Sequence, residues 1–161
     1  MLKYGFLCAL MLLAGAGTVS AQTNIALGGI AVDTSAAIEV TADSLSVDQD
    51  TGVAVFDGDV LIVQGDLRLS AARVEVIYGT DTSEIARLIA TGNVTFVTAT
   101  EAAEAQRAEY DVTTGLLNLS GDVLLTQGAS AISAAEMTIN VTDGTATMSG
   151  RVRTILQQGG N

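Results

Sequence analysis

Carboxylates supply nearly all of the reactive side chains in this sequence. The 161 residues include 18 Asp and Glu but no His, and the single Cys is Cys8. Two carboxylate pairs stand close together, Asp48 with Asp50 and Asp57 with Asp59. A glycosidase needs one carboxyl in an apolar pocket and a second at a defined separation. These pairs lie beside glycines, so we expect solvated turn residues, no catalytic residue and no enzymatic activity.

The segment Asp48–Gly52, read DQDTG, resembles the start of a calcium-binding loop. Such a loop needs a third acidic ligand and a closing bidentate Glu, and both are missing here. We therefore predict neither a metal site nor a cofactor.

A short motif of Gly, any residue and Val recurs along the chain. Its copies are Gly58-Asp59-Val60, Gly92-Asn93-Val94, Gly121-Asp122-Val123 and Gly150-Arg151-Val152, at spacings of 34, 29 and 29 residues. Self-similarity at such a period is typical of repeat proteins, whose stacked units share one continuous core.

The repeat extends well beyond this motif. Residues 42–65 align without a gap to residues 105–128, a unit between them is stretched near 79–83, and a fourth runs from 134 to about 156. Glycines mark one turn near residues 52, 115 and 144, a second at the Gly-x-Val motifs, and a third at residues 65 and 128. Three turns per unit predict a β-repeat with strands of roughly five to eight residues.

Apolar and variable positions alternate within each unit, as a half-buried sheet requires. The position of Val60 is Val in every unit, whereas that of Val55 becomes Asn118 and Thr147 elsewhere. One face should therefore carry apolar side chains along the whole domain. The residues expected to line this interior are Val47, Phe56, Val60, Ile62, Leu69, Val76, Leu88, Val94, Phe96, Tyr110, Leu119, Val123, Leu125, Ile139, Met148 and Val152.

One segment conflicts with the β-repeat. Residues 100–110, read TEAAEAQRAEY, have the Ala and Glu content of a helix. The repeat register places them in a strand with small residues facing inward. We expect the strand, with a helix as the alternative.

The two ends differ from the repeat. Residues 1–21 combine a basic start at Lys3, an apolar run over 6–16 and a small-residue cleavage site at 19–21, which predicts a cleavable signal peptide and export. An uncleaved membrane anchor is the alternative. We expect tails over 22–37 and 157–161 around one domain at 38–156. The net charge of −11 argues against nucleic acid and anionic membranes as partners.

The repeat unit has a recognisable form. It reads Ile38-Glu39-Val40-Thr41-Ala42-Asp43, then Phe56-Asp57-Gly58-Asp59-Val60 and Gln64-Gly65, followed by Leu67, Leu69, Ala71 and Val74. This order of Ala-Asp, Gly-Asp-Val and Gln-Gly elements resembles the OstA-like repeat family of periplasmic lipopolysaccharide-transport proteins. The resemblance covers roughly residues 38–156.

The resemblance implies a repetitive antiparallel β-jellyroll, with two sheets set in a V, open ends and an apolar interior groove. It implies that the groove carries the acyl chains of lipid A across a Gram-negative periplasm, from the inner to the outer membrane. It also implies that protomers stack head to tail between an inner-membrane extraction complex and an outer-membrane translocon. The stretched second unit and the Ala-rich third unit depart from the family pattern and bear on the width of the groove.

Two other interpretations remain at this stage. One is a structural, self-assembling β-solenoid whose interior is packed and holds no lipid. The other is a carbohydrate-active enzyme, which would need paired acids on one face, and the alignment does not supply them.

Overall fold

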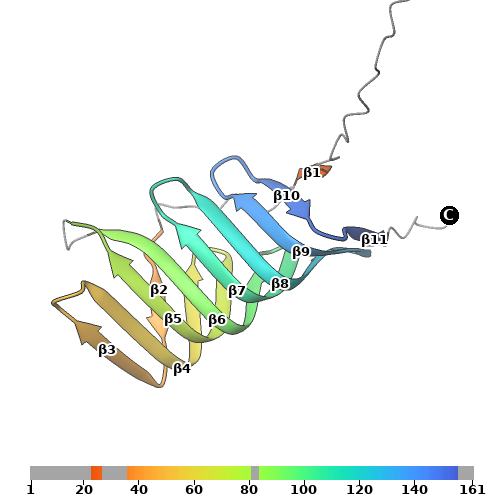
Figure 1. Ribbon diagram of the computed structural model, residues 1–161. Coiled ribbons are helices and arrows are strands. Elements are labelled where there is room, and N and C mark those ends of the chain that lie inside the picture. The colour runs from red at the N-terminus through yellow and green to blue at the C-terminus, as the bar shows by residue number, and fades with distance from the viewer. Residues whose placement is uncertain (1–22, 27–35, 81–83, 156–161) are drawn as a thin grey trace, which may run out of the picture.

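The described part of the chain forms one antiparallel β-sheet. The computed structural model describes residues 23–26, 36–80 and 84–155 (Figure 1). Their strands are β1 Thr23–Ala26, β2 Glu39–Thr41, β3 Ser44–Asp48, β4 Val53–Gln64, β5 Leu67–Tyr78, β6 Ile85–Val97, β7 Glu101–Asp111, β8 Leu116–Gln127, β9 Ser130–Asn140, β10 Thr145–Ser149 and β11 Arg153–Ile155. The order across the sheet is β1-β10-β9-β8-β7-β6-β5-β4-β2, while β3 also pairs with β4 and β11 with β9. The all-β prediction is confirmed.

Three of the four Gly-x-Val motifs lie inside strands, and the prediction that they are turns between strands was wrong for these three. The fourth, Gly150-Arg151-Val152, lies between β10 and β11. In β6 the pairing with β7 shifts between Thr91 and Val94, and both Gly92 (φ 82°) and Asn93 (φ 48°) adopt positive φ. One extra residue in one strand makes a β-bulge, which bends the strand without ending it. β4 and β8 are bulged at the same repeat position. As a result the long strands, β4 to β9, hold 11 to 13 residues, not five to eight.

These kinks divide the sheet into two leaves. The first leaf contains β1, β3, β10 and the half-strands 53–57, 73–78, 85–91, 107–111, 116–120 and 136–140. The second leaf contains β2, β11 and the half-strands 60–64, 67–70, 94–97, 101–104, 123–127 and 130–133. The strands bend at the kinks, so that the second leaf lies behind the first in Figure 1. The jellyroll prediction is confirmed, with the two sheets being halves of one continuous sheet.

The structure tests some of the predictions made for segments at the ends of the chain and for the Ala- and Glu-rich segment. Residues 101–111 form strand β7, as the repeat register predicted. The segment expected to be an N-terminal tail contains β1, which pairs with β10. The predicted signal peptide, 1–21, and the predicted C-terminal tail, 157–161, lie outside the described residues. Within the described ranges, no helix is both long and apolar enough to cross a membrane.

Candidate functional site: an apolar interior between the leaves

The inner face of the first leaf carries two rows of side chains. Directly opposed residues of antiparallel strands lie on the same face, so the register shows which residues share a row. The row nearer the leaf's free edge runs Val47, Ala54, Val76, Leu88, Tyr110, Leu117, Ile139 and Ala146. The row nearer the kinks runs Leu45, Phe56, Val74, Ala90, Ala108, Leu119, Met137 and Met148.

The kinks and the second leaf supply the opposite wall. Val60, Val94 and Val123 each follow a kink and face Ala71, Ala105 and Ala134 across the strand pair. Beyond them, an inner row runs Val40, Ile62, Leu69, Phe96, Ala103, Leu125, Ile132 and Thr154. The structure therefore gathers nearly all of the predicted interior residues into one apolar core between the leaves.

A cavity occupies part of this interior. It is lined by Ile38, Ile62, Gln64, Leu67, Leu69, Val74, Leu88, Ala90, Phe96, Ala108, Tyr110, Leu117 and Val141. Its strand residues come from β4 to β8. Small side chains at Ala90 and Ala108 leave room at the centre of a row that elsewhere holds larger residues. Tyr110 is half-buried there, and this burial raises the pKa of its phenol above the ordinary 10.0.

The interior is closed further along the sheet. Leu125, Met137, Ile139 and Met148 are each at most 1% exposed, and none of the four lines the cavity. Buried side chains in proteins are generally close-packed, so a further chain could enter there only if these side chains moved. The apolar interior is thus hollow over β4 to β8 and tightly packed near β9 and β10.

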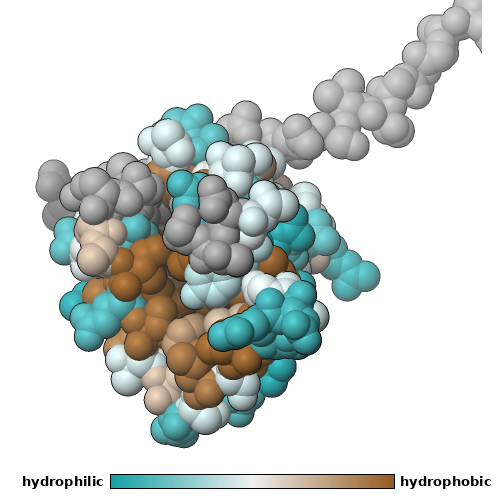
Figure 2. Space-filling view, turned by 90° about the vertical axis from the view of Figure 1, so that its left-hand side faces the viewer, coloured by the Kyte–Doolittle hydropathy of each residue, from teal (hydrophilic) through white to brown (hydrophobic). Residues whose placement is uncertain are grey.

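The end of the sheet that carries β3 is open. Val47, a predicted interior residue, is 62% exposed, and its neighbour on the same face, Leu45, is 55% exposed. Figure 2 looks onto this end and shows apolar side chains gathered in a hollow and surrounded by polar residues. At the other end, Val152 lies between β10 and β11 and is 40% exposed, so the structure does not place it in the buried column of Val60, Val94 and Val123.

Sequence reasoning missed several interior residues. The alanines Ala71, Ala105 and Ala134 are all buried, as are Val74, Leu117, Val141 and Met137. Period-two alternation along β5, β7, β8 and β9 was the signal that could have found those that lie in strands. Ala gives a weak apolar signal, which explains why the kink partners were not recognised.

Two carboxylates, those of Asp48 and Asp111, accept backbone hydrogen bonds in turns. The Oδ1 of Asp48 accepts hydrogen bonds from the backbone N–H of Thr51 (3.2 Å) and Asp50 (2.9 Å), which lower its pKa below 3.8. Asp111 occupies the same repeat position and accepts from the N–H of Thr114 at 2.9 Å, with its pKa likewise lowered. Both side chains therefore stabilise hairpin turns. No group of acidic residues in the described ranges could hold a metal ion.

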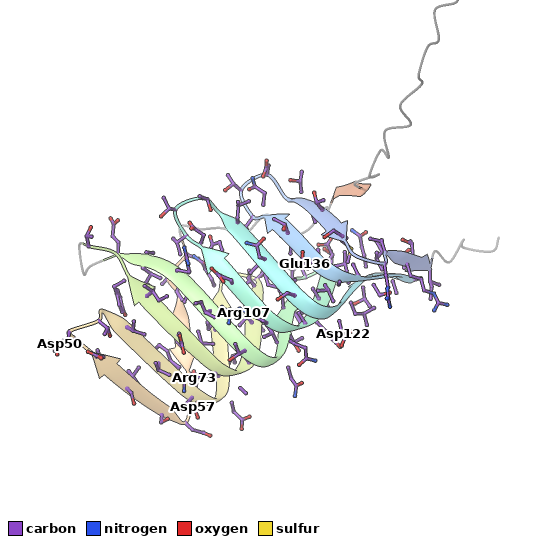
Figure 3. The ribbon with its side chains drawn as sticks, viewed as in Figure 1. Asp50, Asp57, Arg73, Arg107, Asp122 and Glu136 are labelled. Carbon is purple, nitrogen blue, oxygen red and sulfur yellow. The ribbon has the colours of Figure 1, made fainter. Side chains whose placement is uncertain are left out.

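Charged residues gather on the outer face of the first leaf. Figure 3 labels Asp57, Arg73, Arg107 and Glu136, which the register places in one outward row. Arg73 pairs with Asp57 at 3.3 Å, and Arg107 with Glu109 at 3.3 Å. Exposed ion pairs of this kind contribute about 0–1 kcal/mol each. The outer face is thus charged and solvated, whereas the inner face is the candidate binding surface.

Comparisons with known proteins agree with this geometry. The family model described as "LptA/(LptD N-terminal domain) LPS transport protein" matches residues 39–153. The fold is similar to that of LptH from Pseudomonas aeruginosa, described as the LptA-homologous periplasmic component of the conserved lipopolysaccharide transport device, with a TM-score of 0.69 and 18% sequence identity. That match covers 76% of this chain and 96% of the other. No curated protein matches the chain in sequence.

Proposed function

The chain belongs to the LptA/LptD N-terminal domain family of LPS transport proteins, and we propose that it carries the acyl chains of lipid A in its interior as a non-enzymatic bridge across a Gram-negative periplasm. The observation that carries this proposal is the apolar interior, which contains a cavity and is open at the β3 end. The periplasmic location is supported by the predicted signal peptide and by the likeness to LptH, itself a periplasmic component.

Charge supports binding by the lipid tails. Lipid A is phosphorylated, and a chain of net charge −11 repels an anionic headgroup. Burying acyl chains against apolar side chains contributes roughly 25 cal/mol per Å² without requiring any positive group. The interior meets this requirement, because its lining is almost wholly aliphatic or aromatic, while the charged rows lie on the outer face.

Strand direction supports head-to-tail stacking of protomers. Since the whole sheet is antiparallel, β3 runs in the same direction as β5, β7 and β9. A β3 strand placed beside β10 of another copy would continue the alternation, and β2 could extend β11 in the same way. Such strand addition would also cover Leu45 and Val47. The ends of such a stack would meet the inner-membrane extraction complex and the outer-membrane translocon.

A packed structural protein remains the second candidate, because one observation favours it. The buried side chains of Met137, Ile139 and Met148 occupy the interior near β9 and β10, and none of them lines the cavity. A protein that only self-assembles needs no cavity, however, and the hollow over β4 to β8 favours the carrier.

The test places a photo-crosslinking amino acid at Phe96, which lines the cavity, and at Val97, the next residue on the same strand, which faces outward and is 36% exposed. In intact cells, irradiation should yield lipopolysaccharide adducts from position 96 and few from position 97. Outward Val55 serves as a second control on another strand. Adducts from positions 97 and 55 with none from position 96 would refute lipid binding in the interior.

A further inference from the structure

The N-terminal strand pairs with the far end of the sheet. β1 lies antiparallel to β10, with Thr23 opposite Met148 and Ala26 opposite Thr145. The next described strand, β2, is at the opposite end of the strand order. Figure 1 likewise shows β1 beside β10 and well away from β2 and β3. The edge of β10, which another copy would use in a stack, is therefore already occupied by the chain itself.

β1 and β3 are interchangeable by geometry. Both are antiparallel to an even-numbered strand of the first leaf, so both run in the same direction. β1 places Thr23 and Ile25 opposite the inward residues Met148 and Ala146. β3 is one residue longer, with Leu45 and Val47 on its inward face. The strand of another copy would thus bring two apolar residues, Leu45 and Val47, to the edge of β10.

The second leaf has no such cap in the described ranges. There β11 pairs only with β9, so its outer edge is available to β2 of another copy. An incoming copy could first pair in the second leaf and then compete for β10. Two opposing effects govern the competition between β1 and the incoming β3. The tethered β1 is favoured by an effective concentration in the millimolar range, whereas β3 is favoured because its pairing buries the apolar surface of Leu45 and Val47.

We propose that β1 is an intramolecular cap on β10, which limits self-association of the free protomer and is displaced by β3 of the next copy. This inference rests on the stacking included in the proposed function. It assigns a regulatory role to a segment that lies outside the repeat.

A reversible tether tests the cap directly. Asn24 and Thr147 are directly opposed, and opposed residues in antiparallel strands have Cα atoms about 4.5–5.5 Å apart, within disulfide range. The variant N24C/T147C is made in a Cys8→Ser background, because Cys8 is the only cysteine. Sedimentation velocity then measures self-association of the purified chain when oxidised and when reduced. We expect at least tenfold weaker association in the oxidised form.

The matched control is N118C/T138C. Asn118 on β8 and Thr138 on β9 are directly opposed and lie in the same outward row as Thr147. The hydroxyl of Thr138 donates a hydrogen bond to the Oδ1 of Asn118 at 2.8 Å. A disulfide there should leave association unchanged. A second variant acts in the opposite sense: Ile25→Pro removes a backbone N–H from β1 and fixes its φ, which weakens the cap. It should associate at least several-fold more tightly than the unaltered chain.

Three results would overturn the cap. One is equal association of oxidised and reduced N24C/T147C. Another is a ladder of covalent oligomers on a non-reducing gel, which would show that β1 pairs with β10 of a neighbouring copy. The third is a chain that stays monomeric in every variant, which would remove stacking and the cap together. Lipid adducts at position 96 in that third case would leave the carrier function standing, so the two proposals fail separately.

Discussion

The kink at Gly92 provides a quantitative test of how the sheet folds into two leaves. Gly92 has φ 82°, and a Cβ added there would lie 2.8 Å from the Cβ of Ala72 on β5. Gly52 has a similar φ of 65°, yet a Cβ there would meet nothing within 4 Å. The Gly92→Ala and Gly52→Ala variants therefore share the cost of a left-handed backbone and differ in the steric contact.

The magnitudes follow from these two contributions. A left-handed backbone costs an Ala residue roughly 1–2 kcal/mol, offset by about 0.4–1 kcal/mol from the stiffer unfolded chain. Overpacking adds about 1–3 kcal/mol at Gly92 alone. The Ala72 contact cannot be relieved by rotating a side chain, because Ala has no side-chain rotamers. We expect Gly92→Ala to lower the free energy of unfolding by about 1–3 kcal/mol more than Gly52→Ala.

The assay is equilibrium urea unfolding followed by far-UV circular dichroism, which suits a chain without Trp. Ala72→Gly removes the opposing Cβ, so the double variant should recover most of the steric cost, with a coupling of about 1–3 kcal/mol in a double-mutant cycle. Equal losses for Gly92→Ala and Gly52→Ala, or additive effects in the cycle, would refute the close approach at the kink.

Two further predictions concern the cavity and the turns. Ala108→Leu fills the cavity, so the yield of lipid adducts from a crosslinker at position 96 should fall several-fold, and the free energy of unfolding should fall by no more than about 1–3 kcal/mol. Outward Ala102→Leu is the control and should leave the adduct yield unchanged. An undiminished yield from Ala108→Leu would contradict binding of the acyl chain in this cavity. The N–H of Thr114 holds the pKa of Asp111 below 3.8 in the folded chain. The ionised Asp111 carboxylate therefore stabilises the fold above pH 3.8, and this stabilisation is lost as the pH falls through the lowered pKa of the folded chain. Asp111→Asn cannot titrate and should show a shallower loss of unfolding free energy below pH 3.8 in urea titrations; an unchanged slope would contradict that role.

The interior face was predictable because its signal has the period of a strand. Val76, Tyr110 and Ile139 fall in one row across β5, β7 and β9, as their alignment between repeats required. The same alignment placed residues 100–110 in a strand against their helical composition, and the structure has strand β7 at Glu101–Asp111. Burial beside two neighbouring strands outweighs local propensity there. Repeats give this advantage, since each unit reports on the same environment.

The kinks and the cap were not predictable in the same way. A glycine with positive φ serves a turn or a bulge equally well. The two are distinguished only because Thr91 and Val94, on either side of Gly92, both pair with β7. The residue after each of the Gly-x-Val glycines also has positive φ. Asp and Asn adopt this conformation more readily than most residues, which explains why one of them follows three of the four glycines. β1 lacks the repeat, and its partner β10 is more than a hundred residues away, so no local pattern indicates the pairing.

The two interpretations of the interior apply to different parts of one molecule. In the row nearer the kinks, the side chains are smallest at Ala90 and Ala108 in the centre. They become larger at Leu119, Met137 and Met148. An acyl chain seated over β4 to β8 can therefore advance toward β10 only if the large side chains move or the leaves separate. Met side chains adapt readily, because they are unbranched and have three rotatable bonds. A carrier needs such displaceable packing, whereas a purely structural core would gain nothing from the hollow beside it.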